Sequence, residues 1–279
     1  MKIISSPEKM KEYAAEARAQ NKTVALVPTM GALHDGHLSL IDKARESADI
    51  TVVSVFVNPT QFGPNEDFDK YPRQLEEDAA KCEARGADAI FAPAVSDIYA
   101  PDASTFVSEE QISQNLCGKS RPKHFRGVAT VLTILFNIVR PDFAVFGEKD
   151  AQQISVIERM ARDLFMDVKI LRAPIVRDEN GLALSSRNKY LDTYERIGAA
   201  RIYRALLAGK KLADEGCLNV DRIKALVINT VTNAKTRVIY AEIVDDMTSL
   251  PISEVRPGKS RISIAVWFGQ TRLIDNIRI

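Results

Sequence analysis

Short apolar segments alternate with helical patterns from residue 23 to residue 174, and this alternation constrains the fold more than any other feature. The run ITVVSVFV (50–57) is almost continuously β-branched, as in a strand buried on both faces. We expect further strands at 23–28, 87–93, 142–147 and 167–174, and helices at 7–20, 37–48, 73–86, 127–139 and 150–164. Strand–helix alternation predicts a Rossmann-like, doubly wound α/β fold with a parallel sheet.

The pattern changes beyond about residue 175. One long helix is expected at 192–216 and a second at 220–232, followed by strands at 236–246, 261–269 and 271–279. This is the pattern of a smaller α+β unit. We therefore predict two domains, residues 1–175 and residues 176–279.

Charge and composition exclude several classes of protein. Lys and Arg number 38 against 37 Asp and Glu, so the basic excess of a nucleic-acid-binding surface is missing. The N-terminal MKIISSPEKMKEY lacks the apolar core of a signal peptide, and apolar stretches such as 131–139 are too short to span a bilayer. The three cysteines, which are widely spaced, suit neither a disulfide framework nor a cysteine zinc site. We predict a cytoplasmic protein with no membrane or nucleic-acid partner.

The segment PTMGALHDGH (28–37) holds two of the chain's three histidines, His34 and His37. It lies between the first strand of the alternation and its helix, where ligands bind in doubly wound sheets. Gly31 permits a tight turn, and the N-terminus of the following helix favours phosphate. Two alternatives stay open. The histidines could simply cap the helix, or they could bind a metal together with His124.

Two other strand ends carry polar side chains. FVNPTQF (56–62) places Asn58 and Gln61 where neutral amides suit a hydroxylated ligand. FGEKDAQQ (146–153) places Lys149 where a point charge suits a phosphate. Each has a simpler interpretation, namely an Asx turn for Asn58 and a solvated surface position for Lys149.

LALSSRNKYL (182–191) joins two hydroxyls to an arginine in a loop between the two predicted domains. Such a loop could contact phosphates, or it could only cap a short helix. Asp150 and Gln153 are likewise spaced as a capping box, a role that could coexist with binding.

These segments together resemble a known family. H-x-G-H after a first strand is similar to the nucleotidyltransferase superfamily that includes class I aminoacyl-tRNA synthetases. The longer P-T-M-G-A-L-H-x-G-H resembles the pantoate–β-alanine ligase (pantothenate synthetase) family. FVNPTQF, HFRGVATV (124–131), FGEKDAQQ and LALSSRNKYL occur in the order and at the spacing of that family, and the similarity covers essentially the whole chain.

The resemblance implies ATP-dependent condensation of pantoate with β-alanine through a pantoyl-adenylate, with release of AMP and pyrophosphate. The implied catalytic residues are His34, His37 and Lys149. The implied ATP-binding residues are Met30, His34, His37, Gly147, Lys149, Asp150, Val176, Leu184, Ser185, Ser186 and Arg187. The implied pantoate-binding residues are Pro28, Thr29, Met30, Asn58, Gln61 and Gln153.

The family also implies Mg²⁺ near Asp78, although an acid on a helix is more commonly part of a solvated face. It implies a homodimer, with residues 1–175 binding nucleotide and pantoate and residues 176–279 acting as a lid. We take the stretch 63–72 as a candidate closing loop. Two alternative functions remain: a nucleotidylyltransferase acting on a phosphate-bearing acceptor, and an RNA-binding module. The near-neutral charge argues against the second.

Overall fold

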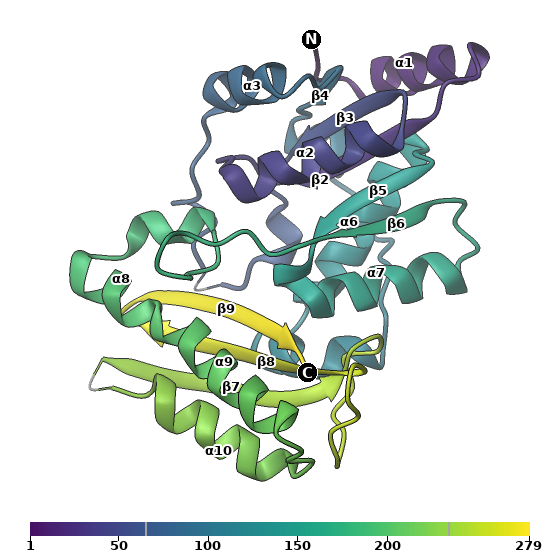
Figure 1. Ribbon diagram of the computed structural model, residues 1–279. Coiled ribbons are helices and arrows are strands. Elements are labelled where there is room, and N and C mark those ends of the chain that lie inside the picture. Colours follow the sequence, from purple (N-terminus) through teal and green to yellow (C-terminus); the bar gives the residue numbers. More distant parts are fainter. Residues whose placement is uncertain (65, 234) are drawn as a thin grey trace. The chain divides into compact units, whose positions relative to one another are not determined.

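The computed structural model describes residues 1–64, 66–233 and 235–279 (Figure 1). Contacts divide the chain into two compact units. The first comprises Met1–Glu109, Arg121–Glu148 and Val156–Pro174. The second comprises Glu110–Ser120, Lys149–Ser155 and Ile175–Ile279.

The first unit is built on a six-stranded parallel sheet with the order β1-β4-β3-β2-β5-β6. Its strands are β1 (Lys2–Ile4), β2 (Val24–Thr29), β3 (Ile50–Val55), β4 (Ala89–Phe91), β5 (Phe143–Gly147) and β6 (Lys169–Ala173). The predicted α/β fold with a doubly wound parallel sheet is thereby confirmed. The short edge strand β1 was not predicted, because only one of its three residues is buried and no apolar run marks it.

Helices flank this sheet. They are α1 (Pro7–Ala19), α2 (Asp35–Ser47), α3 (Leu75–Ala84), α4 (Val95–Ile98), α6 (His124–Val139) and α7 (Ala151–Asp163), of which α7 begins in the second unit. Ala25 and Val27 of β2 join a core cluster with side chains of α2 and α3. The alternate residues Val24 and Leu26 are also fully buried, and they point to the opposite face of the strand. Both faces of the sheet are therefore covered, as the apolar runs predicted.

The strand order creates a switch point beside β2. The chain leaves β2 to form β3 on one side and later returns to form β5 on the other side. Ligands in open α/β sheets bind outside the carboxyl ends of the strands at such a point. Here those ends are Thr29 of β2 and Gly147 of β5.

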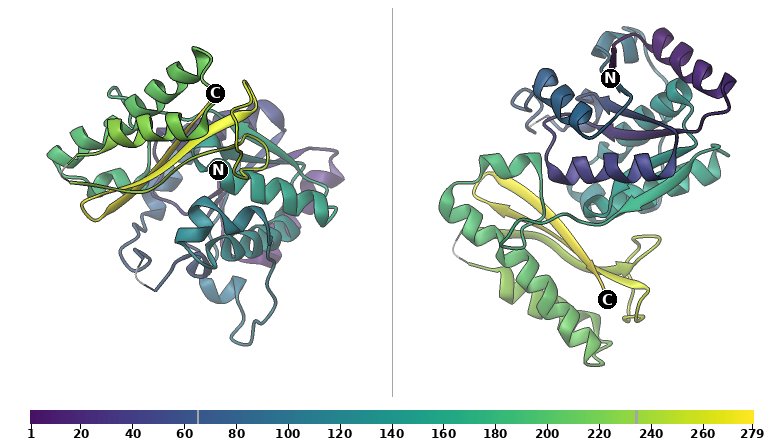
Figure 2. Two further views of the ribbon diagram at one scale, coloured as in Figure 1. Left: turned by 90° about the horizontal axis from the view of Figure 1, so that it is seen from below. Right: turned by 45° about the horizontal axis from the view of Figure 1, so that its top comes forward.

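The second unit has an antiparallel sheet with the order β7-β8-β9. Its strands are β7 (Thr236–Asp245), β8 (Ser260–Phe268) and β9 (Thr271–Arg278), and its longer helices are α8 (Thr193–Ala199), α9 (Arg201–Asp214) and α10 (Val220–Val231). Figure 2 shows α9 and α10 along one side of this sheet. A Cβ at Gly209 of α9 would lie 2.7 Å from Val227 of α10 and 2.8 Å from Ile262 of β8, so glycine lets the layers approach closely.

One element prediction in the second unit is wrong. The single helix expected at 192–216 is two helices, α8 and α9, which meet at Ala200. Gly198, a poor helix former, lies two residues before the junction. A capping box begins α8, because Glu195 N donates to Asp192 Oδ1 and Asp192 N donates to Glu195 Oε2. Among the helices of the described residues, none combines the length and the apolar character that a membrane crossing requires.

Candidate functional site

The loop after β2 turns tightly at Gly31 and Ala32. Gly31 has φ +82° and Ala32 has φ +52°, so two successive residues occupy the left-handed region. A Cβ at Gly31 would lie 2.9 Å from Asp78 Oδ2. Thr29 supports the turn, since its hydroxyl donates to the Ser54 carbonyl and accepts from Gly31 N. Pro28 lies within β2, paired with Ser54.

Asp78 of α3 fixes this loop from outside. Its side chain is fully buried, and its two carboxylate oxygens accept hydrogen bonds from Ala32 N at 2.9 Å and from Leu33 N at 2.8 Å. Lys81, one turn later, donates from Nζ to the Leu33 carbonyl. The alternative that Asp78 belongs to a solvated helix face is therefore wrong. Sequence reasoning missed the bracing role, because nothing in EEDAAK indicates which of the acids turns inward.

His34 and His37 lie together at the start of α2. His34 is the N-cap residue of the helix, and the two ring centroids are 4.0 Å apart. His34 N donates to His37 Nδ1 at 3.4 Å, so a neutral His37 carries its proton on Nε2. The helix begins at Asp35, two residues before the predicted start. His34 thus occupies the N-cap position and the ring of His37 accepts from its backbone N–H, an arrangement that is compatible with phosphate binding at the same helix end.

A second group of site residues surrounds the 3₁₀ turn η1 (Pro59–Gln61). Asn58 is 1% exposed, and its Nδ2 donates to Gln61 Oε1 and to the Gly127 carbonyl, both at 3.1 Å. Tyr99 donates its hydroxyl to Asn58 Oδ1 at 2.8 Å. The Asx-turn interpretation of Asn58 is confirmed, since its Oδ1 also accepts from Thr60 N. In this geometry Asn58 holds Gln61, whose side chain is only partly buried.

Gln61 is also linked to the loop after β2. Its Nε2 contacts Met30 Sδ at 3.1 Å, within hydrogen-bond distance for sulfur. Met30 directly precedes Gly31, so the amide predicted to bind pantoate touches the segment that leads to His34 and His37. The structure thus brings together the strand-end residues that the sequence placed at the switch point.

The backbone of Gln61 is held by the start of α6. A Cβ at Gly127 would lie 2.5 Å from the Thr60 carbonyl oxygen, so a glycine at this position lets the turn η1 pack directly against α6. His124 Nδ1 lies 2.9 Å from the Gln61 carbonyl, and Arg121 Nη1 lies 2.9 Å from His124 Nε2. A guanidinium only donates hydrogen bonds, so Nε2 of His124 is the acceptor from Arg121. Nδ1 of His124 therefore carries the hydrogen and donates a hydrogen bond to the Gln61 carbonyl. The family block HFRGVATV therefore serves the turn that bears Gln61.

Arg121 extends this network to Glu66 within the stretch 63–72. Its guanidinium donates from Nε and Nη2 to the two carboxylate oxygens of Glu66, each at 2.6 Å. Burial raises the pKa of Glu66, but the hydrogen bonds and the charge of Arg121 outweigh it and lower this pKa to about 2. Asn65 of the same stretch lies outside the described residues. The closing-loop role of 63–72 stays a prediction.

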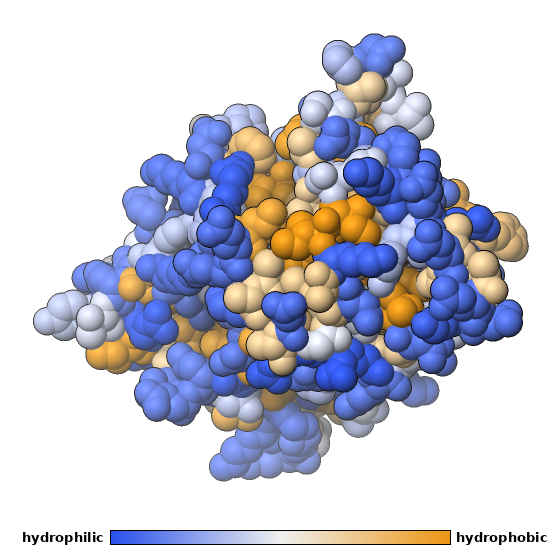
Figure 3. Space-filling view, turned by 90° about the horizontal axis from the view of Figure 1, so that it is seen from above, coloured by the Kyte–Doolittle hydropathy of each residue, from blue (hydrophilic) through white to orange (hydrophobic). Residues whose placement is uncertain are grey.

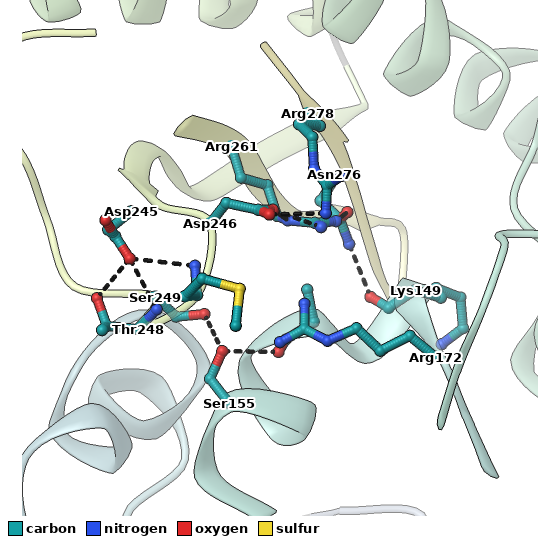
Figure 4. Close-up of polar contacts among 12 residues, drawn as sticks. Lys149, Ser155, Arg172, Asp245, Asp246, Thr248, Ser249, Arg261, Asn276 and Arg278 are labelled. Atoms are coloured by element: carbon teal, nitrogen blue, oxygen red, sulfur yellow. Dashed lines mark hydrogen bonds and ion pairs between the residues drawn. The ribbon is translucent and has the colours of Figure 1, made fainter. Parts of the chain in front are cut away.

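Lys149, Asp150 and Gln153 belong to the second unit. Lys149 lies in the 3₁₀ turn η3 (Glu148–Asp150), and its ammonium donates to Asp150 Oδ2 at 3.1 Å. Its carbonyl accepts a hydrogen bond from Asn276 Nδ2 at 3.1 Å (Figure 4). Asp150 directly precedes α7, in the position of an N-cap, and Gln153 lies half-buried in the first turn.

The remaining predicted ATP-binding residues follow one another in a hairpin and a short turn. Leu184 N donates to the Val176 carbonyl at 2.9 Å, which pairs the two arms of the hairpin. The 3₁₀ turn η4 (Ser186–Tyr190) then begins with Ser185 as its N-cap, where Ser185 Oγ accepts from Arg187 N. The capping alternative for Ser185 is confirmed, and the Arg187 side chain is partly buried.

A protein-built metal centre is not found in the part of the chain that the structure describes. Within residues 1–64, 66–233 and 235–279, no three His, Cys, Asp or Glu side chains are grouped to hold an ion. The alternative of a metal bound by His34, His37 and His124 is therefore not supported. Asp78 does not fit a metal ligand in this geometry, since both of its oxygens accept backbone hydrogen bonds in a fully buried position.

Comparison with known proteins gives one consistent result. The family model described as Pantoate-beta-alanine ligase matches residues 2–278. The chain is 50% identical over 277 residues to a pantothenate synthetase of Thermotoga petrophila, with 99% of each sequence covered. It is 47% identical over 278 residues to a pantothenate synthetase of Acetivibrio thermocellus, again with 99% of each covered.

Two solved structures share the fold over its full length. A pantothenate synthetase of Thermus thermophilus has a TM-score of 0.94 and 41% identity, covering 100% of this chain and 99% of the other. A pantoate-beta-alanine ligase of Francisella tularensis, described as complexed with beta-gamma ATP and beta-alanine, has a TM-score of 0.83 and 34% identity. This match covers 100% of the present chain and 97% of that one.

Proposed function

The chain belongs to the pantoate-beta-alanine ligase family, and from this premise we propose how its residues join pantoate to β-alanine at the expense of ATP. The observation that carries the proposal is the family match over residues 2–278 together with an H-x-G-H loop fixed at the switch point of the sheet. The relative whose structure is described as complexed with beta-gamma ATP and beta-alanine supports two of the three substrates.

The first step is the adenylation of pantoate. Its carboxylate oxygen attacks the α-phosphorus of ATP, a P–O bond forms, and pyrophosphate leaves with the electrons of the bond that breaks. A carboxylate is ionised at neutral pH, so no protein base is needed. Catalysis then consists of alignment and of stabilising charge on the phosphates. We assign the second task to His34, to the Nε2–H of His37 and to the ammonium of Lys149.

We assign pantoate to the part of the site that carries the side-chain amides of Asn58, Gln61 and Gln153. Gln61 supplies neutral donors and acceptors from a turn whose backbone is fixed by Arg121 and by His124 of α6. Met30, Thr29 and Pro28 line the neighbouring strand end, and Asn58 acts chiefly by holding the Gln61 amide. Gln153 is assigned to pantoate from the second unit.

ATP is assigned to the H-x-G-H loop, to Gly147 at the end of β5, and to the segments of the second unit that carry Lys149 and the 176–187 hairpin. Arg187 and the hydroxyls of Ser185 and Ser186 suit the triphosphate, since charge-assisted hydrogen bonds to phosphate are strong. Val176 and Leu184 are paired across the hairpin and supply apolar surface beside them. Asp150 is the last of the residues that we assign to ATP binding.

In the second step the β-alanine amine attacks the acyl carbon of the adenylate. A C–N bond forms and AMP leaves. The amine reacts only in its neutral form, and water must be kept from the activated acyl group. We propose that residues 176–279 act as a lid over a nucleotide- and pantoate-binding domain of residues 1–175, and that the stretch 63–72 contributes to closure.

We propose that Mg²⁺ arrives with the triphosphate, because magnesium is commonly held by phosphate oxygens and few protein carboxylates. The metal would neutralise phosphate charge. The assignment of Asp78 as its protein ligand does not fit the described hydrogen bonds, so no step here is routed through that residue or through the metal.

We further propose that the enzyme is a cytoplasmic homodimer. The family resemblance supports this, and so does the first unit's sheet, which ends at β1 with the side chain of Ile3 57% exposed. Figure 3 shows apolar side chains gathered on the face of the molecule seen from above. Light scattering should give twice the mass of one chain, whereas the mass of a single chain would remove this part of the proposal.

Pyrophosphate exchange tests the order of steps. With ATP and pantoate but without β-alanine, labelled pyrophosphate should exchange into ATP, because the acid is activated first. Omitting pantoate should abolish the exchange. If exchange requires β-alanine, the adenylate scheme is wrong for this chain.

A further inference from the structure

Two adjacent residues of the last strand, Asp275 and Asn276, are buried polar groups that the proposed function does not use. They are 3% and 4% exposed. Neighbouring side chains of a strand point to opposite faces of the sheet. Asp275 and Asn276 can therefore hold different segments on the two faces of β9.

Asn276 holds the backbone of Lys149. Its Nδ2 donates to the Lys149 carbonyl at 3.1 Å, and its Oδ1 accepts from Arg261 Nη1 (Figure 4). Arg261 is 3% exposed and is paired in turn with Asp246, with Nη2 and Oδ1 2.6 Å apart. The Asn276 amide is thus oriented by a buried ion pair, which leaves Nδ2 aimed at Lys149.

Asp275 holds the hairpin that carries Val176 and Leu184. Its carboxylate accepts two hydrogen bonds from Arg177, at 2.6 Å from Nη1 and 2.9 Å from Nη2. Arg177 Nη1 also donates to the Gly181 carbonyl at the hairpin turn, and its guanidinium stacks over the ring of Tyr203 at 3.8 Å. A planar, bidentate pair of this kind fixes orientation as well as position.

We propose that Asp275 and Asn276 are positioning residues for adenylation, with Asn276 fixing Lys149 and Asp275 fixing the 176–187 segment through Arg177. This inference rests on the proposed function, which assigns both segments to ATP. Neither residue touches substrate. They act by holding two nucleotide-binding segments to one rigid strand, so that the charges that meet the phosphates are set before ATP binds.

The test uses near-isosteric substitutions in the full-length enzyme. Asn276→Asp keeps an oxygen for Arg261 but replaces the donor to Lys149 with a second acceptor. Asp275→Asn keeps one acceptor for Arg177 and removes the charge. Glu242→Gln is the matched control, because Glu242 lies in β7 of the same sheet and forms its ion pair with Lys224, outside both ATP segments. Thermal unfolding identifies any variant that fails to fold.

Asn276→Asp and Asp275→Asn should each lower kcat/KM for ATP in pyrophosphate exchange by about tenfold, while KM for pantoate stays within about twofold. Glu242→Gln should match wild type. Combining Asn276→Asp with Lys149→Ala should cost little more than Lys149→Ala alone, because Asn276 acts through Lys149. A purely structural role would lower the melting temperature without this selectivity or non-additivity.

Three outcomes would overturn the inference: unchanged ATP kinetics in both folded variants, equal losses for ATP and pantoate, or full additivity with Lys149→Ala. If the two variants do not fold, Arg177→Lys tests the Asp275 arm, because it keeps the charge but not the bidentate geometry. Wild-type kinetics for ATP in the Arg177→Lys variant would also contradict the positioning role of Asp275. Failure of wild-type exchange itself would instead contradict the proposed function.

Discussion

At the scale of single residues, the two histidines at the start of α2 carry the clearest prediction. His34→Ala and His37→Ala should leave the fold intact and lower turnover by roughly 10²–10³, the usual cost of removing one preorganised donor from developing charge. Steady-state kinetics and circular dichroism measure the two effects. Glu46→Ala, at an exposed position of the same helix, serves as the control. Near-wild-type turnover in both histidine variants would exclude a phosphate role.

Gln61 and Lys149 should separate the two substrates. Gln61→Ala should weaken apparent pantoate binding by about 0.5–1.5 kcal/mol, the usual value of a neutral hydrogen bond, with little effect on ATP. Lys149→Ala should act mainly on ATP, and more strongly, since its contact is charge-assisted. Michaelis curves for each substrate, with the other saturating, provide the measurement. Equal shifts for both substrates in both variants would show that the site is not divided in this way.

At the scale of elements, α3 should control the shape of the H-x-G-H loop through Asp78. Asp78→Asn places an NH₂ group against the backbone N–H of Ala32 or Leu33, both of which now donate to the carboxylate. We expect about 1–3 kcal/mol of lost unfolding free energy, together with reduced turnover. Denaturant titration measures the first quantity, and Glu76→Gln on the exposed side of α3 is the control. An Asp78→Asn enzyme as stable and as active as wild type would refute the bracing role.

The pair between Glu66 and Arg121 should make the stretch 63–72 sensitive to acid. The folded pKa of Glu66, about 2, lies below its ordinary value of 4.5. Its contribution to stability is therefore fully present above pH 4.5 and is lost as the pH falls towards about 2. Glu66→Gln should be less stable than wild type near neutral pH, and the gap between their melting temperatures should close through this window. A gap independent of pH would disprove the linkage.

The periodic elements of this fold were predictable because their signal is local. Buried parallel strands such as β3 and amphipathic helices such as α10 are written in continuous stretches of sequence. The edge strand β1 was not predicted, because it is three residues long and pairs with β4, which is distant in sequence. The break between α8 and α9 was not predicted either, since the helical pattern of 192–216 continues through Ala200.

The places of the candidate residues in the fold were predictable where these residues lie next to a strand end, as with His34, Gln61 and Lys149. The supporting residues were not. Asp78 contacts a loop 45 residues earlier in the chain, and Asn276 contacts a carbonyl 127 residues earlier. Such contacts depend on tertiary packing, which no local spacing reveals. A buried acid on a helix looks the same in sequence as a solvated one.

At the scale of the whole molecule, the proposed nucleotide and pantoate groups are divided between the two units. The H-x-G-H loop, Gln61 and Gly147 belong to the first unit, whereas Lys149, Gln153 and the 176–187 segment belong to the second. Each group is rigidly supported within its own unit, by Asp78 and α6 in the first and by β9 in the second. The proposed function therefore assigns roles to residues of both units.

One measurement tests the central claim most directly: product formation from ATP, pantoate and β-alanine, with AMP, pyrophosphate and pantothenate quantified together. We predict one AMP for each pantothenate, no ADP, and no turnover when any of the three substrates is omitted. Pyrophosphate should appear in the same ratio. Formation of ADP in place of AMP would contradict the adenylate mechanism. A nucleotidyl product on a phosphate-bearing acceptor, with no pantothenate from the three substrates, would contradict the proposed function itself.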